Sequence, residues 1–170
     1  GQSEGKPEPK GVFEDSNAAL NYVRSRQDVD PERLFVFGQS LGGTNAIAVV
    51  GSGNRAGVKA AAIESTFYSY SAIANEKLSG AGLLVNDDYA ASKYVAAISP
   101  IPLLLIHGTA DQVIPISHSR RLLADAREPK RLIEVPSAAH LEPMTSLRYG
   151  SAYRKALTEF FESALHPLQQ

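Results

Sequence analysis

One serine of this sequence stands in a pattern that can build a nucleophile. The run Gly38-Gln39-Ser40-Leu41-Gly42 fits G-x-S-x-G, follows an apolar stretch directly and opens a predicted helix. A sharp strand-to-helix turn projects a serine oxygen outward, where a nearby base can take its proton. We expect Gly38 and Gly42 to be required, because side chains there would collide with the neighbouring strand and helix. The opposing interpretation is a glycine-rich turn whose serine does no chemistry.

The base that such a serine needs must be one of four histidines. His107 ends an apolar stretch, which favours a packed, hydrogen-bonded core side chain. His118 is expected to be solvated in the first turn of a helix, and His166 lies in the C-terminal tail. His140 instead occupies a loop of small residues, where an imidazole can closely approach another loop. His140 is therefore the predicted base.

Asp111 is the predicted acid that orients this base. Ser40, Asp111 and His140 each follow a different predicted strand. Loops at the carboxyl ends of parallel strands meet at one edge of a sheet, so the three side chains are expected to lie together. The N–H of Leu41, which begins the helix behind Ser40, is the predicted donor to a developing oxyanion.

Strands and helices are predicted to alternate around these residues. Apolar runs and periodicity place strands at residues 34–37, 58–63, 103–106 and 132–135, and helices at residues 11–26, 41–50, 117–127 and 147–165. The first ten residues are expected to form a loop, and Ser117 is the expected N-cap of its helix. The alternation predicts an α/β fold of three layers, with a mainly parallel sheet between two layers of helices.

Three segments resemble those of a known family. GQSLGG, LLLIHGTADQVIP and VPSAAH look like the elbow, acid loop and histidine loop of the α/β-hydrolases, and their Ser, Asp, His order is the same. The opening GQSEGKPEPKGVFEDSNAAL resembles the segment before the elbow, although Ser3 itself follows no strand and is not an elbow. The likeness is to small esterase-, thioesterase- and peptidase-like members without a large cap domain. It implies that residues 66–100 form a lid or acyl pocket, and core packing explains their apolar side chains equally well.

The resemblance also implies a partial fold. The full fold has about eight strands, and the four predicted here match its C-terminal half from the elbow strand onward. The preceding half would supply the second oxyanion donor and the neighbour of the strand at residues 34–37. We therefore expect the open edge of this strand to be covered by another polypeptide. The chain would then be a fragment, one piece of a cut protein, or a half-domain completed by a homo-oligomer.

The composition of the chain excludes some classes of binding site. The 170 residues contain no cysteine and carry a net charge of −1, which excludes a thiolate metal site and a basic nucleic-acid footprint. We expect one domain over residues 1–170, with no cofactor and no metal. We expect no signal peptide in the first residues, which are too polar for one. The chain is cytoplasmic by default, and the resemblance leaves a membrane-anchored parent open.

Together these features predict a serine hydrolase of a small acyl substrate. Ser40 would form an acyl-enzyme from a carboxylic ester or thioester, with His140 as base. One alternative is a serine peptidase of the same fold. The other is a non-catalytic half-domain that retains these residues and acts in interaction.

Overall fold

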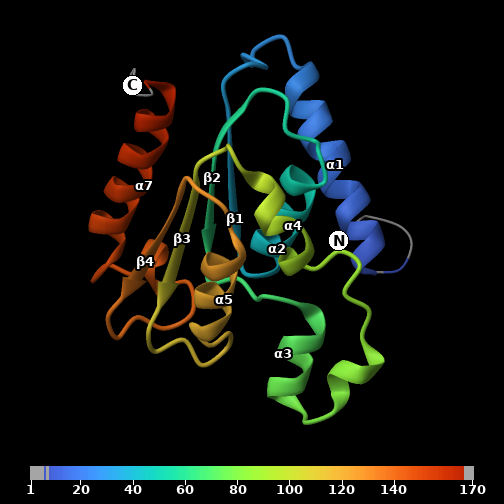
Figure 1. Ribbon diagram of the computed structural model, residues 1–170. Helices are drawn as coiled ribbons and strands as arrows, with labels where there is room; N and C mark the ends of the chain where they lie inside the picture. The colour runs from blue at the N-terminus through green and yellow to red at the C-terminus, as the bar shows by residue number, and fades with distance from the viewer. Residues whose placement is uncertain (1–5, 7, 167–170) are drawn as a thin grey trace.

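A four-stranded parallel sheet forms the centre of the molecule. The computed structural model describes residue 6 and residues 8–166, so Ser3 lies outside the described residues. The strands are β1 (Leu34–Gln39), β2 (Val58–Glu64), β3 (Leu103–Gly108) and β4 (Lys130–Val135). They lie in the order β1-β2-β3-β4, with every neighbouring pair parallel. Helices cover both faces of the sheet (Figure 1), as the predicted three-layer α/β/α fold requires.

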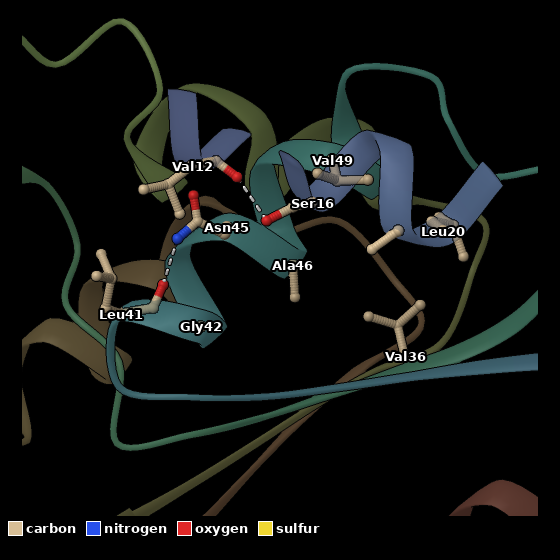
Figure 2. A pocket seen from close by; sticks show the side chains of 10 residues that line it. Val12, Ser16, Leu20, Val36, Leu41, Gly42, Asn45, Ala46 and Val49 are labelled. Carbon is tan, nitrogen blue, oxygen red and sulfur yellow. Dashed lines mark hydrogen bonds between the residues drawn. The ribbon is translucent and has the colours of Figure 1, made fainter. Parts of the chain in front are cut away.

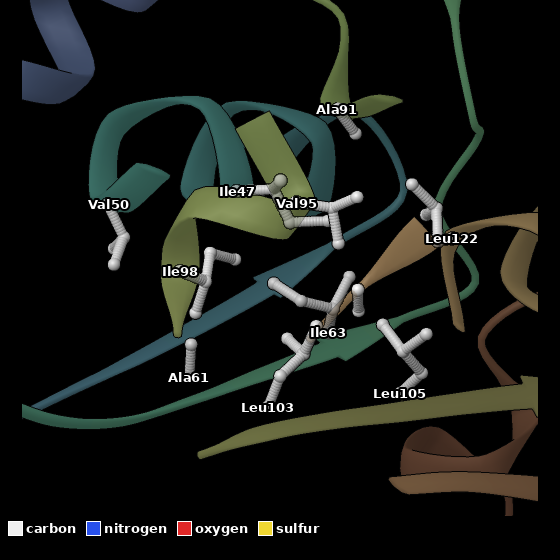
Figure 3. Close-up of a cluster of buried hydrophobic side chains, with 11 residues drawn as sticks. Ile47, Val50, Ala61, Ile63, Ala91, Val95, Ile98, Leu103, Leu105 and Leu122 are labelled. Atoms are coloured by element: carbon white, nitrogen blue, oxygen red, sulfur yellow. The ribbon is translucent and has the colours of Figure 1, made fainter. Parts of the chain in front are cut away.

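One face of the sheet is covered by α2 (Leu41–Gly51), α4 (Ala91–Tyr94), the 3-10 helix η2 (Val95–Ile98) and α5 (Ser117–Asp125). Their apolar side chains meet those of the strands in a fully buried cluster (Figure 3). Ile47 and Ile98 pack there against residues such as Leu103 and Leu105. The small side chains at residues 60–62 of β2 leave room for the helices to approach the sheet closely.

The other face is covered by α7 (Gly150–Leu165), which α6 (Glu142–Thr145) precedes. An apolar stripe of this helix, which includes Tyr153 and Leu157, packs against the buried cluster of Leu104 and Ile106. The remaining helices are α1 (Pro9–Ser25), which lies beside α2, and α3 (Tyr70–Lys77), which lies below the sheet in Figure 1.

Several predicted boundaries were wrong by a few residues. Helix α1 begins at Pro9, inside the predicted loop, because proline at the first helical position lacks only an N–H that would stay unbonded there. Ser117 is the first residue of α5 rather than its N-cap, which is Ile116. Residues 66–100 hold four short helical segments, among them η1 (Ala81–Leu84). Within the described residues, no helix is long and apolar enough to cross a bilayer.

Candidate active site

Ser40 lies in a strained turn between β1 and α2. Its φ of 51° and ψ of −124° are unusual for a residue with a side chain. A Cβ at Gly38 would lie 2.6 Å from the backbone of Gly42, so Gly38 is required as predicted. A Cβ at Gly42 would meet nothing within 4 Å, so the predicted steric role of Gly42 was wrong. That role belongs to Gly43, whose Cβ would lie 2.7 Å from the side chain of Ile63.

Hydrogen bonds from the end of β2 hold this turn on both sides of the serine. The Ser40 N–H donates to the main-chain oxygen of Glu64 over 2.9 Å. The Thr66 hydroxyl donates to the Ser40 carbonyl over 2.7 Å and lies 2.9 Å from the Thr44 hydroxyl. The last residue of β2 and the segment just after it thus satisfy both backbone polar groups of the strained residue, which keeps the conformation in place.

The structure brings Ser40, His140 and Asp111 into one hydrogen-bonded line. His140 Nδ1 lies 2.7 Å from Asp111 Oδ2, and His140 Nε2 lies 3.2 Å from Ser40 Oγ. A carboxylate only accepts, so Nδ1 carries the proton and Nε2 is free to accept the serine proton. Ser40 follows β1, His140 follows β4 and Asp111 follows β3, and the carboxyl ends of these strands meet at this edge. The His140 side chain is 18% exposed, whereas that of Asp111 is fully buried.

Asp111 is held as an anion by its surroundings. Its Oδ1 accepts the backbone N–H groups of Val113 and Ile114, each over 2.9 Å. Its Oδ2 lies 3.3 Å from His107 Nε2. Although burial alone would raise the pKa of Asp111, the hydrogen bonds from His107, Ile114 and His140 hold it well below its usual range. An ionised acceptor therefore faces His140 at neutral pH.

The other histidines have different environments. His107 is fully buried, and its ring nitrogens lie 2.7 Å from the Ser119 hydroxyl and 2.7 Å from the Ile114 carbonyl, which confirms a packed core histidine. The prediction that His118 is solvated was wrong. His118 is fully buried, accepts the Tyr68 N–H over 2.9 Å, and has its pKa lowered by burial. The sequence could not show that residues 66–100 pack over α5.

Leu41 lies at the position predicted for an oxyanion donor. It is the first residue of α2, so its N–H has no acceptor within the helix. The N-terminus of α2 points at the same place and favours negative charge there. Leu41 is 45% exposed, which leaves this position open to a substrate.

Glu64 is a residue of this edge that the sequence analysis did not select. It ends β2, is fully buried, and contacts the residue before Ser40 and the helix after His140. Burial raises its pKa, against the opposing effect of its hydrogen bonds. The available signal was a carboxylate at the end of the strand VKAAAIE, where an acidic residue is unusual.

The free side of β1 has a different character. Phe35 and Phe37 are 37% and 41% exposed, although Phe35 stacks on Phe161 at 4.6 Å between ring centroids. Beside the strand, a hollow of about 410 Å³ opens between α1 and α2 (Figure 2). Its lining is mainly apolar and includes Val36 and Leu41. None of the lining residues belongs to residues 66–100.

Comparison with known proteins identifies the family of this fold. A model of the prolyl oligopeptidase family matches residues 6–167. The chain belongs to the prolyl oligopeptidase family. It is accordingly an α/β-hydrolase, and the four parallel strands with flanking helices are part of that fold, as predicted. Family and fold are those of hydrolases.

Several proteins are similar in sequence or in fold to this member of the prolyl oligopeptidase family. "Uncharacterized protein YfhR" of Escherichia coli O157:H7 is 48% identical over 98% of this chain and 58% of its own length. The "Alpha/beta hydrolase domain-containing protein WAV2" of Arabidopsis thaliana is 33% identical over 95% of this chain and 57% of its own length. The chain thus spans less than two thirds of these relatives. The crystal structure of an esterase domain from Rhodothermus marinus superposes with a TM-score of 0.68 at 21% identity, over 90% of this chain and 68% of that one.

Proposed function

We propose that this chain carries the nucleophile, base and acid of a serine hydrolase that cleaves a carboxylic ester or thioester. The observation that carries the proposal is the hydrogen-bonded line from Ser40 through His140 to Asp111. Chance packing of three polar residues from three loops does not usually align two ring nitrogens with a hydroxyl and a carboxylate. The strained turn at Ser40 adds support, because such strain recurs where a nucleophile is exposed.

The chemistry follows from the proton positions. Ser40 Oγ attacks the carbonyl carbon while His140 Nε2 takes its proton, and Asp111 stabilises the imidazolium that forms. The carbonyl oxygen becomes an oxyanion and accepts the N–H of Leu41. When the tetrahedral intermediate collapses, His140 gives its proton to the leaving alcohol or thiol. A water molecule, deprotonated by the same nitrogen, then releases the acid from Ser40.

An ester or thioester is the proposed substrate because its leaving group departs more easily than an amine. Leu41 is the one oxyanion donor that the elbow itself supplies, and the loss of one donor costs about 10²–10³-fold in rate. Activated acyl groups tolerate such a loss better than amides do. Peptide hydrolysis is the second candidate, and the family match favours it, since that family is named for a peptidase.

Covalent labelling tests the nucleophile. A fluorophosphonate probe should label the wild-type chain and leave Ser40→Ala unlabelled. Ser52→Ala, at the other end of α2, is the matched control and should label like wild type. Because the chain spans 58% of YfhR, the same variants should also be made at the matching positions of full-length YfhR. Absence of Ser40-dependent labelling in both forms would favour the non-catalytic half-domain.

A substrate series then addresses the bond that is cleaved. The proposal expects hydrolysis of p-nitrophenyl esters and acyl thioesters, measured over increasing acyl length, and little release of p-nitroaniline from peptide anilides. Faster cleavage of the anilides than of the matched esters would instead support the peptidase. Residues 66–100 are the proposed lid or acyl pocket, so a truncation of their exposed Leu83 and Leu84 should alter the dependence on acyl length.

A further inference from the structure

Glu64 is a buried carboxyl group whose position is unexplained by charge pairing. Its side chain belongs to a residue with 0% exposure, and none of the ion pairs among the described residues includes it. Burying a carboxyl group costs free energy unless its oxygens are hydrogen-bonded. The partners of those oxygens therefore indicate why the group is there.

Each carboxyl oxygen of Glu64 binds a different part of the site. Oε2 accepts the side-chain N–H of Gln39 over 2.5 Å, and Gln39 directly precedes Ser40. Oε1 accepts the backbone N–H of Met144 over 3.1 Å, and Met144 lies in α6, directly after the loop of His140. The main-chain oxygen of Glu64 accepts the N–H of Ser40 itself. One residue thus contacts the segment of the nucleophile and the segment of the base.

These two segments follow β1 and β4, the two edge strands of the sheet, which do not pair with each other directly. They are 100 residues apart in sequence, and Ser40 and His140 meet through a hydrogen bond of 3.2 Å that is 18% exposed at the histidine. A single, partly exposed hydrogen bond contributes little to holding its partners together. Hydrogen bonds to the carboxyl group of Glu64, which is fully buried and has no water to replace a lost partner, hold them more strongly.

We propose that Glu64 is a positioning residue that sets the distance between Ser40 and His140 by joining Gln39 to Met144. The inference rests on the proposed function, in which Ser40 passes its proton to His140. Glu64 touches neither the substrate nor the reacting atoms, so it acts through the two segments that it joins. Its removal should therefore slow the chemical step and leave substrate binding nearly unchanged.

Two substitutions separate hydrogen bonding from mere filling of space. Glu64→Leu keeps most of the side-chain volume and removes both hydrogen bonds. Glu64→Gln keeps both, because its oxygen can accept the Met144 N–H while its amide donates to the oxygen of a rotated Gln39 amide. We expect Glu64→Leu to lower kcat by about 10²-fold, as a misplacement of about 1 Å does, with KM within twofold. Glu64→Gln should retain most of the activity.

A destabilised control distinguishes positioning from general loss of stability. Val50 lies at the far end of α2 and is fully buried. Val50→Ala should lower the thermal stability, as removal of buried methyl groups does, yet leave kcat and the rate of fluorophosphonate labelling unchanged. If Val50→Ala and Glu64→Leu lose activity in proportion to their loss of stability, Glu64 has only a structural role and the proposal is wrong.

A spectroscopic measurement keeps the inference testable even if no ester is cleaved. The proton between His140 and Asp111 should give a low-field NMR signal, assigned by its disappearance in His140→Ala. The proposal expects this signal to shift or broaden in Glu64→Leu and to return in Glu64→Gln. An unchanged signal in Glu64→Leu would overturn the proposal. Equal loss of the signal in Glu64→Leu and Glu64→Gln would also overturn it, because the charge of Glu64 rather than its hydrogen bonds would then be required. A wild-type protein that fails to label Ser40 but shows these shifts refutes the proposed function alone.

Discussion

The carboxyl end of β1 and the free side of the same strand are built in opposite ways. At the carboxyl end, the backbone N–H and carbonyl of Ser40 are bonded to Glu64 and Thr66, and Gly38 has no space for a side chain. Along the free side, Phe35 and Phe37 remain more than a third exposed on one face of the strand, and an apolar hollow lined by Val36 opens on the other face. Contacts within the chain therefore determine the first region. The second region retains partly exposed aromatic side chains.

This difference teaches where the chain can tolerate change. A turn with little space and fully satisfied polar groups has one low-energy arrangement, so small substitutions there disturb the site. An exposed strand edge is a template for pairing with another polypeptide. We therefore expect substitutions at this edge to change association more than they change the free energy of unfolding. We therefore retain the prediction that another polypeptide covers the free edge of β1.

The largest expected effect is at the acid of the site. Asp111→Asn keeps the shape but can offer an N–H instead of an acceptor to His140, which favours the wrong imidazole tautomer. We expect kcat for ester hydrolysis to fall by about 10⁴-fold. Asp28→Asn, at an exposed ion pair with Arg26, is the control and should match wild type. Equal rates for Asp111→Asn and wild type would remove Asp111 from the mechanism.

Alanine substitutions at Gly38 and at Gly42 should lower the free energy of unfolding by very different amounts. In Gly38→Ala the new methyl group would meet the backbone of Gly42 at 2.6 Å, so we expect a loss of about 3 kcal/mol in the free energy of unfolding. Gly42→Ala has open space and should change this free energy by no more than about 0.5 kcal/mol. Urea unfolding of both variants measures the difference. Similar losses for the two would mean that the carboxyl end is less tightly packed than described.

Two buried carboxyl groups of the same edge should respond to pH in opposite directions. The folded pKa of Asp111 is lowered, so the stability that Asp111 contributes is complete above about pH 5 and is lost as the pH falls below about 4. The folded pKa of Glu64 is raised, so its contribution is most favourable below about pH 4 and is lost as the pH rises through that folded value.

Urea unfolding between pH 3 and pH 8 tests both signs. The gap between wild type and Asp111→Asn should widen from acid to neutral pH. Glu64→Gln resembles the protonated acid and does not titrate. The free energy of unfolding of this variant should therefore rise relative to that of wild type between acid and neutral pH. A gap that narrows for Asp111→Asn would contradict the assignment of an ionised Asp111.

The smallest effect on folding is expected at the free edge. Phe37→Lys places a charge on a side chain that is 41% exposed, so the free energy of unfolding should change by less than about 1 kcal/mol. The same change should weaken association, measured by sedimentation velocity over a range of concentrations. Tyr22→Lys removes an exposed aromatic ring from α1 and is the matched control. If Phe37→Lys and wild type sediment alike at every concentration, this strand edge does not mediate self-association.

Local patterns were enough to predict the elements that carry the site. Short apolar runs placed all four strands, because a buried parallel strand has few polar residues along its length. The same patterns placed Ser40, Asp111 and His140 at one edge, since each follows a strand. They failed for His118, which is buried by a segment distant in sequence. They also assigned to Gly42 a steric role that belongs to Gly43.

The sequence by itself determined the fold class, the order of the strands along the chain and the residues that could do chemistry, because these depend on periodicity and spacing. Only the tertiary structure decided which groups touch. The contact of Glu64 with both Gln39 and Met144 joins residues that lie 25 and 80 positions from it. Such contacts depend on how strands and helices pack in space, and no local pattern records that packing.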